Sequence, residues 1–598
     1  MAQEPSVKVG DIPILFRRLK EPELGVNGYD GPAHSVTILK AGHRKEEDVK
    51  AFGVDTIYEK DVEIPMRDGI ILKGDIFRPA TSDSENVPAI IPWSPYGKTG
   101  RGLSLNFMPG RMGVPRANTS GYEKFEAPDP AEWTARGYAV VNIDSRGAWD
   151  SQGYLCWAGT QEGRDGYDAI EWIAKLPWCT GSVATAGNSW LGRSQWYIAA
   201  ERPPSLKCIA PLEGSGDLYR EIHVRGGIAC TPFLEWMMTN LRGRGYMEDP
   251  VAMLKKYPLM NDYWKDKRAQ IFNIEVPAYV LASYSTFLHL PGSLRGFDEI
   301  PHNDKWLRVH ESQEWHDLYQ KRTTDELQIF FDRYLKGIEN GWETTPQVRV
   351  SLLGYNQPNI RNQVYKAWPP AETKYTTLFA GTGDQLLVHA ATDQSFVSYQ
   401  SDVDAQQVDN DTEELHFRLK IPERTFLIGA VKAVLYLSCD DVDDMDIFLQ
   451  VRKANKDGLI LRSYNVPDDD MAAMGIPREK VPLVNPVVYL GPHGQIRASH
   501  RAIDMNISKP HYISHAHLVE ERIRRGSVVR VETSIWPGGI IFENGEYLVI
   551  KVSGHPMYLA EFPTLRGAFK ANNKGLHKVW IGGESASHFV VPFVEPPI

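Results

Sequence analysis

The sequence of 598 residues contains only five cysteines, and none of them shows the paired spacing of a zinc site. An odd number of scattered cysteines is typical of reduced thiols, so we expect a cytoplasmic protein. Cofactor signatures are also lacking, because no phosphate-binding glycine loop follows an apolar strand pattern. We therefore expect neither a metal nor any other cofactor.

Long apolar runs are absent as well. The longest ones, such as residues 88–93 and 138–143, have strand length and fall far short of the roughly 20 residues that a membrane-spanning helix needs. The first residues lack a basic start followed by an apolar core, so we expect no secretory leader. With a net charge of −10, the chain lacks the basic excess typical of nucleic-acid-binding proteins. We expect a small-molecule substrate and no membrane or nucleic-acid partner.

The chain contains two different sequence textures, and its length favours two or three domains. We expect an N-terminal arm over residues 1–54, an α/β core over 55–213 and 274–341, and a helical cap inserted over 214–273. Residues 342–598 lack helical spacing and consist of period-2 strands separated by turns, which predicts an all-β domain.

Strand and helix patterns alternate in the first half of the chain. Residues 56–80 alternate apolar and polar side chains around the turn Arg67-Asp68-Gly69, which predicts a β-hairpin. Further strand and helix patterns then follow one another up to "LKCIAPLEG", which predicts a parallel sheet with helices on both faces. The segment "TTDELQIFFDRYLKG" predicts a last helix that Glu326 opens and Gly337 follows.

The stretch "ATAGNSWLGRSQWYIAA" places Ser189 between Gly187 and Gly192, after a strand pattern and before a helix pattern. A serine hydroxyl is a weak nucleophile until a base removes its proton. A tight strand-to-helix turn would expose Ser189 and aim the backbone N–H of Trp190 at a developing oxyanion. The second glycine comes one residue later than in a G-x-S-x-G elbow, so a purely structural turn is the alternative.

Acyl-transfer chemistry also needs a second oxyanion donor. Tyr96 in "WSPYGKTG" follows an apolar strand pattern, so it should lie at the same end of the sheet as Ser189. A phenol can donate a hydrogen bond to an oxyanion, although a tyrosine in this position could equally serve in packing.

Several of these segments resemble the cocaine esterase and X-Pro dipeptidyl-peptidase family of α/β-hydrolases. "GNSWLGRSQWYIAA" resembles its nucleophile elbow, "PWSPYGK" its oxyanion-tyrosine loop, and "RASHRAID" and "VETSIWPGGIIFENGEYLVIKVSG" its C-terminal domain. The resemblance runs from about residue 55 to the C-terminus. It implies an α/β-hydrolase fold with a helical cap insertion, followed by an all-β jelly-roll domain. It also implies Ser189 as the nucleophile, with the Tyr96 hydroxyl and the Trp190 N–H as the oxyanion hole.

The rest of the triad departs from the family pattern. The resemblance places an aspartate after the strand that follows the cap, and a histidine after the next strand. Ser285 stands at the first of these places, and the second segment, "KWLRVHESQEWHDLY", offers both His310 and His316. His289 lies close to where the acid should be.

Three arrangements therefore remain open. In the first, His310 is the base and Asp298, Glu311 or Glu314 orients it. In the second, His289 is the base and Glu314 its acid, so that the two loops have exchanged roles. In the third, the site no longer hydrolyses anything, because loss of the orienting carboxylate typically costs several orders of magnitude in rate.

The function expected from these features is that of a serine hydrolase, which cleaves an ester or amide through an acyl-enzyme. The aromatic-rich cap favours a small apolar or aromatic acyl group. One alternative is a hydrolase-fold biosynthetic enzyme that transfers or releases an acyl group, for example from a thioester, or catalyses a non-hydrolytic step. Another is an inactive ligand-binding protein. The resemblance leaves homo-oligomer formation open.

Overall fold

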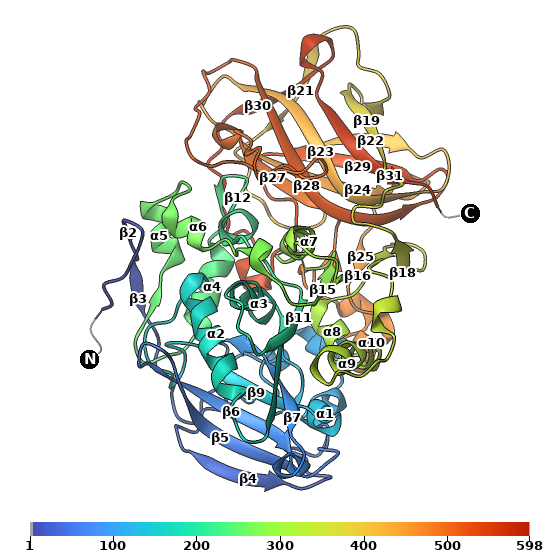
Figure 1. Ribbon diagram of the computed structural model, residues 1–598. Coiled ribbons are helices and arrows are strands. Elements are labelled where there is room, and N and C mark those ends of the chain that lie inside the picture. Colours follow the sequence, from blue (N-terminus) through green and yellow to red (C-terminus); the bar gives the residue numbers. More distant parts are fainter. Residues whose placement is uncertain (1–3, 287, 597–598) are drawn as a thin grey trace.

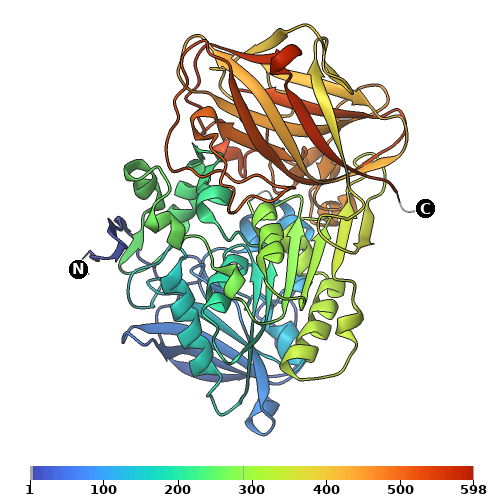
Figure 2. The same ribbon diagram turned by 45° about the horizontal axis from the view of Figure 1, so that its top comes forward.

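The computed structural model describes residues 4–286 and 288–596, which form an α/β domain and a β-rich domain that lies against it (Figures 1 and 2). Within the described residues, a twelve-stranded mixed sheet forms the centre of the α/β domain. Its strands are β4 (Ser35–Leu39), β5 (Thr56–Pro65), β6 (Ile71–Pro79), β7 (Val87–Ile91), β8 (Trp93–Ser94), β9 (Ala139–Asp144), β10 (Cys179–Asn188), β11 (Leu206–Leu212), β15 (Ala278–Ser283), β16 (Lys305–His310), β17 (Val348–Leu352) and β18 (Ile360–Tyr365).

The strand order places the connections that matter for function at one edge of this sheet. The order is β18-β17-β16-β15-β11-β10-β7-β9-β6-β5-β4, with β8 beside β9. All strands from β17 to β9 in this order run parallel to their neighbours, whereas β18 at one end and β6, β5 and β4 at the other are antiparallel. The loops that follow β8, β10, β15 and β16 therefore meet at the carboxyl edge, where open α/β sheets bind ligands.

The strands of the parallel centre are mostly apolar because both faces of the sheet are covered. Every residue of β7, β9 and β15 is buried. The hairpin predicted over residues 56–80 is confirmed as β5 and β6, with Gly69 in the turn at φ +83°. A left-handed conformation of this kind favours glycine because it has no Cβ.

Helices cover both faces of the sheet, with α2 and α3 on one face and α1 and α9 on the other (Figures 1 and 2). The helices of the α/β core are α1 (Pro130–Ala135), α2 (Thr160–Ile173), α3 (Trp190–Ala200), α7 (Leu290–Glu299), α8 (Glu314–Leu318) and α9 (Lys321–Leu335). No helix in the described part of the chain is both long enough and apolar enough to cross a membrane.

The start predicted for the last helix was wrong. Helix α9 begins at Lys321, so Glu326 lies inside it, whereas Gly337 follows its end at φ +68° as predicted. Its first turn carries no side-chain cap and little apolar periodicity, so the usual signals of a helix start are missing there.

The segment between β11 and β15 forms the cap. It contains α4 (Pro232–Asn240), α5 (Pro250–Lys256) and α6 (Asp262–Asp266), together with the short strands β12 (Val224–Arg225), β13 (Ile228–Ala229) and β14 (Tyr246–Glu248). The N-terminal arm packs on this cap and on the sheet. Strand β3 (Phe16–Arg18) pairs with β14, β1 (Lys8–Val9) pairs with β2 (Ile12–Pro13), and β4 forms an edge of the large sheet.

The β-rich domain is built from a second sheet, of eleven strands within the described residues. They are β19 (Lys374–Gly381), β20 (Gln385–Leu387), β21 (Ser395–Gln400), β22 (Glu414–Lys420), β23 (Thr425–Cys439), β24 (Asp446–Ala454), β27 (His493–Arg497), β28 (Val529–Phe542), β29 (Tyr547–Ser553), β30 (Leu576–Ile581) and β31 (His588–Val594). We expected the β domain to begin at residue 342, and strands β17 and β18 lie beyond that residue. They nevertheless extend the first sheet, because β17 pairs in parallel with β16.

A long connection between β24 and β27 leaves the β-rich domain and packs into the core of the α/β domain. It carries β25 (Ser463–Tyr464), α10 (Asp468–Ala473) and β26 (Val488–Tyr489). Buried side chains of this connection, among them Val466, Met471 and Val484, belong to the hydrophobic core of the α/β domain. Residues of the C-terminal half thereby reach the carboxyl edge of the first sheet.

Candidate active site

Ser189 occupies a strained turn between β10 and α3. Its backbone adopts φ +57° and ψ −116°, a conformation that costs energy for a residue with a Cβ. A Cβ on Gly187 would lie 2.7 Å from the Cβ of Leu191, and one on Gly192 would lie 2.7 Å from the carbonyl oxygen of Glu213. The two glycines thus permit the close approach of strand, turn and helix, as the sequence predicted.

The two predicted oxyanion donors lie beside this serine. The Tyr96 hydroxyl is 3.5 Å from Ser189 Oγ, and burial raises the pKa of Tyr96, so this hydroxyl keeps its proton and can donate. Trp190 is the first residue of α3, where backbone N–H groups have no acceptor within the helix. Its indole N–H donates to Glu162 Oε1 at 2.7 Å, which fixes the ring.

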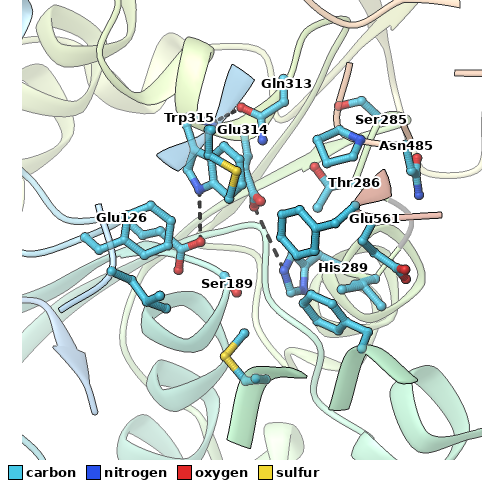
Figure 3. Close-up of a pocket in the computed structure, with 18 of the residues that line it drawn as sticks. Glu126, Ser189, Ser285, Thr286, His289, Gln313, Glu314, Trp315, Asn485 and Glu561 are labelled. Atoms are coloured by element: carbon cyan, nitrogen blue, oxygen red, sulfur yellow. Dashed lines mark hydrogen bonds and ion pairs between the residues drawn. The ribbon is translucent and has the colours of Figure 1, made fainter. Parts of the chain in front are cut away.

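A cavity of about 640 Å³ opens over Ser189 (Figure 3). Polar groups reach it from Tyr96, Glu126, His289 and Glu314. Most of its wall is apolar, with aromatic and methionine side chains from several segments: Phe107, Phe125, Phe233, Trp236, Met237 and Phe562. Phe562 comes from the C-terminal half, so both domains contribute to the wall.

His289 and Glu314 point into this cavity from neighbouring loops (Figure 3). His289 follows β15 at the start of α7, and Glu314 follows β16 as the first residue of α8. His289 Nε2 is 4.0 Å from Glu314 Oε2. Burial, with the nearby charge of Arg193, lowers the pKa of His289 to about 3, so the imidazole is neutral at pH 7 and can accept a proton. Burial raises the pKa of Glu314, and the nearby Glu213 and Glu126 act in the same direction.

His310 lies behind the elbow and is not among the residues that line the cavity. Its Nε2 is 2.5 Å from Glu213 Oε1, and its Nδ1 is 3.9 Å from Asp317 Oδ1. Burial lowers the pKa of His310, but the carboxylates of Asp317 and Glu213 outweigh burial and raise it. The Glu213 carbonyl in turn accepts the Ser189 N–H at 2.8 Å. The His310–Glu213 pair therefore supports the backbone of the elbow.

The other sequence candidates are held by partners of their own. His316 Nε2 is 2.8 Å from Asp470 Oδ2, and Asp298 Oδ2 is 3.3 Å from His511 Nε2. Glu311 Oε1 forms an ion pair with Arg361 at 2.6 Å. None of His316, Asp298 and Glu311 is among the residues that line the cavity over Ser189.

Sequence reasoning missed Glu126, which lines the cavity next to Ser189 (Figure 3). Its Oε1 accepts the indole N–H of Trp315 at 2.9 Å, and its backbone carbonyl accepts the Asn188 N–H at 3.1 Å. Burial raises the pKa of Glu126 to about 8, against the opposing hydrogen bonds from Trp315 and Ser189. Glu126 lies between regular elements at φ +69°, where no periodic pattern marks it.

Two family models match the chain in the order of its domains. The X-Pro dipeptidyl-peptidase (S15 family) model matches residues 68–270, and the X-Pro dipeptidyl-peptidase C-terminal non-catalytic domain matches residues 340–589. The chain belongs to this family of α/β-hydrolases. The family resemblance stated from the sequence is thereby confirmed.

Individual relatives of this family agree with the assignment. A protein of Mycobacterium bovis named as a serine esterase is 29% identical over 252 residues, which are 41% of this chain and 38% of that protein. Cocaine esterase of a Rhodococcus species is 25% identical over 382 residues, or 54% of this chain and 62% of the esterase. The matches thus span less than two thirds of either relative.

One solved structure of a family member matches nearly the whole of this chain. The CocE/NonD family hydrolase from Staphylococcus aureus superposes with a TM-score of 0.82 at 28% identity, over 96% of this chain and 100% of the other. The predicted α/β-hydrolase fold followed by a β-rich domain is thereby confirmed.

The departure from the family pattern that the sequence suggested concerns the two loops beyond the cap. Ser285, at the place where the resemblance puts an aspartate, lines the cavity and donates a hydrogen bond to the Ser312 carbonyl at 3.0 Å. The histidine in the cavity follows β15, and the carboxyl group follows β16. The structure therefore brings together the residues of the second arrangement.

Proposed function

We propose that the chain is a serine hydrolase in which Ser189, His289 and Glu314 form the catalytic triad. The observation that supports this most is that all three side chains line one cavity, whereas His310 is paired with Glu213 behind the elbow. A base needs a neutral nitrogen, and burial keeps His289 neutral while the neighbouring carboxylates favour the charged form of His310.

The reaction follows from these positions. Ser189 Oγ attacks the carbonyl carbon of an ester or amide as its proton passes to His289. The Tyr96 hydroxyl and the Trp190 N–H donate hydrogen bonds to the oxyanion that forms. His289 then gives the proton to the leaving alkoxide or amine, and the acyl group stays on Ser189. Water, activated by His289, attacks the acyl-enzyme and releases the acid.

Glu314 has the role of the orienting carboxylate. Its ionised form stabilises the imidazolium of His289 and favours one orientation of the ring. The 4.0 Å separation of Nε2 and Oε2 is longer than a hydrogen bond. Catalytic hydrogen bonds are often long in a site without substrate and tighten when substrate binds, so this distance is compatible with the role.

The wall of the cavity favours a small apolar or aromatic acyl group. Most of the residues that line it are aromatic, aliphatic or methionine side chains. Apolar surface that leaves water on binding contributes about 25 cal/mol per Å², so an alkyl or aryl group gains more here than a polar one.

The proposal is tested by hydrolysis of 4-nitrophenyl esters of short alkyl acids. Wild type should release nitrophenol, and His289→Ala should lose about 10³- to 10⁴-fold in kcat, as removal of a triad member does. His389→Ala, at an exposed histidine of the β-rich domain, is the matched control. Full activity of His289→Ala would contradict the assignment of the base. Formation of an acyl-enzyme without release of acid would favour acyl transfer over hydrolysis.

A further inference from the structure

The cavity over Ser189 continues into a second lobe of about 550 Å³, which Tyr96, Ser189 and His289 also line. This second lobe differs from the apolar one by its charges. The guanidinium groups of Arg193 and Arg225 line it, together with the hydroxyl of Ser215 and the carboxyl group of Glu561.

Arg193 is the unusual member of this set. It lies in the first turn of α3, directly after the elbow, and its side chain lines the same lobe as Ser189. Its side chain is buried, and the guanidinium stacks on the Trp190 ring with 3.6 Å between its carbon and the ring centroid. Nε and Nη2 have no hydrogen-bond partner among the described residues.

A buried guanidinium with two unpartnered nitrogens is costly. The charge of Glu162 acts favourably on Arg193, but Glu162 Oε1 accepts the indole N–H groups of Trp190 and Trp93 and forms no ion pair with Arg193 among the described residues. Removing a charge from water costs more free energy than stacking on aromatic rings returns. Unsatisfied buried polar groups are few in native structures, and perturbed charged groups cluster at functional sites. Ser215 adds a second buried donor, since its Oγ also lacks a partner among the described residues.

Two further charged groups line the lobe. Arg225 adds a second guanidinium, which donates to the Tyr558 hydroxyl at 3.3 Å and the Cys230 sulfur at 3.1 Å. Glu561 supplies the carboxyl group among the residues that line the lobe. Burial raises its pKa although Arg225 opposes this, so Glu561 offsets at most one of the two positive charges.

We propose that this lobe binds a carboxylate of the substrate, held by the planar fork of Arg193 and by the Ser215 hydroxyl. Guanidinium and carboxylate match each other in shape and form paired charge-assisted hydrogen bonds. The preferred substrates are then esters or amides that carry a carboxylate close to the scissile bond and an apolar group for the first lobe. This inference rests on the proposed function, because it takes Ser189 as the nucleophile.

Two pairs of esters test the inference. Mono-4-nitrophenyl glutarate and 4-nitrophenyl pentanoate differ in a carboxylate or a methyl group at the end of the acyl chain. 4-Acetoxybenzoate and phenyl acetate differ in a carboxylate on the leaving group. For at least one pair, wild type should have the higher kcat/KM for the carboxylate ester. The ratio of kcat/KM for the carboxylate ester to kcat/KM for its neutral counterpart should fall by about 10- to 100-fold in Arg193→Gln. This is the value of a charge-assisted hydrogen bond. Any general damage to the site cancels in the ratio.

Two further variants make the result specific. Arg193→Lys keeps the charge but loses the fork, so its ratio should fall between those of wild type and Arg193→Gln, and it replaces Arg193→Gln if that variant does not fold. Arg202→Gln removes an arginine that is largely exposed and paired with Glu275, and it should leave the ratio unchanged. The inference would be overturned if, for both ester pairs, the ratio is the same in wild type and in the Arg193 variants.

Binding of glutarate, measured by calorimetry, separates this inference from the proposed function. If wild type hydrolyses esters but the Arg193 variants change neither ratio nor glutarate affinity, the carboxylate site is refuted and the proposed hydrolase function is supported. If no ester is hydrolysed but Arg193→Gln weakens glutarate binding tenfold or more, the proposed hydrolase function is refuted and the carboxylate site is supported. If wild type neither hydrolyses esters nor binds glutarate, both proposals are overturned.

Discussion

Ser285 cannot replace a carboxylate beside a histidine, because a neutral hydroxyl does not stabilise an imidazolium as an ionised acid does. Glu314 can do so from the neighbouring loop, 4.0 Å from His289 Nε2. In the triad proposed here, the charges are thereby kept although the order of histidine and acid along the chain is reversed. What matters for the chemistry is where the groups meet, and loops that follow adjacent parallel strands meet at the same edge of the sheet.

The role of Glu314 predicts the pH dependence of activity. Burial raises the pKa of Glu314 above the ordinary range of a glutamate, and only its ionised form stabilises the imidazolium. Activity should therefore rise with pH through a value above about 4.3, the usual pKa of glutamate. Because ionised Glu314 favours the protonated imidazole of His289, the two groups titrate together, and the acid limb belongs to the pair.

Measurement of kcat/KM for a neutral aryl ester between about pH 4 and 9 tests this prediction. Glu314→Gln should lose the acid limb and about 10³- to 10⁴-fold in activity, as triad acids do when amidated. Glu126→Gln, a matched change at another buried carboxyl of the same cavity, should keep the limb. An acid limb at the ordinary glutamate pKa, or full activity of Glu314→Gln, would contradict the role of Glu314.

Local sequence patterns could predict the residues of the elbow but not the partner of Ser189. A glycine-flanked serine between a strand and a helix is a local signal, and so is a tyrosine after a strand. The choice between His289 and His310 depends on which side chain turns into the cavity. Glu213 decides this by pairing with His310. Glu213 is distant from His310 in sequence, so no spacing along the chain could reveal the pair.

At the scale of elements, strongly apolar strands were predictable and weakly marked helices were not. Strands β7, β9 and β10 lie in the buried centre of the sheet, where apolar runs are required. The first turn of α9 lacks a cap and was missed. The strand pattern of β17 was seen, but the sheet that it joins depends on parallel pairing with β16, which a period-2 pattern does not encode.

The elbow itself predicts the effect of one added carbon atom. Gly192→Ala would place a Cβ 2.7 Å from the Glu213 carbonyl oxygen, and backbone cannot yield as a flexible side chain can. We expect a loss of about 1–3 kcal/mol in the free energy of unfolding and a fall in activity, because α3 has to move away from β11. Urea unfolding and ester hydrolysis measure the two effects.

Ala200→Gly at the other end of α3 is the matched control for Gly192→Ala. It lowers helix propensity, by less than the roughly 1 kcal/mol of a helix interior because Ala200 is the last residue of α3, and leaves the elbow untouched. Stability should therefore fall in both variants and activity only in Gly192→Ala. Wild-type stability and activity in Gly192→Ala would show that the helix approaches β11 less closely than described.

At the scale of the molecule, the candidate site depends on both domains. Asn485, Pro486, Glu561 and Phe562 line the cavity from the C-terminal half of the chain. Phe562 packs on Trp236 of the cap, with 4.4 Å between ring centroids. The cap and the C-terminal half therefore close the cavity together over the carboxyl edge of the sheet.

This shared wall predicts the effect of shortening Phe562. Phe562→Ala removes apolar wall and the ring contact with Trp236, a contact worth about 0.5–1.5 kcal/mol beyond area burial. KM for aryl and alkyl esters should rise by about three- to tenfold. Phe396→Ala, at an exposed phenylalanine of the β-rich domain, is the control. An unchanged KM would mean that the Phe562 side chain does not contact the substrate.

The most direct test of the central claim is intact mass after treatment with a fluorophosphonate, which reacts only with an activated serine. We expect one adduct on wild type, no adduct on Ser189→Ala, and labelling of His289→Ala slowed by at least about 10³-fold. His310→Ala, if folded by circular dichroism, should label faster than His289→Ala. Absence of an adduct on wild type, or a loss of labelling in His310→Ala but not in His289→Ala, would contradict the triad proposed here.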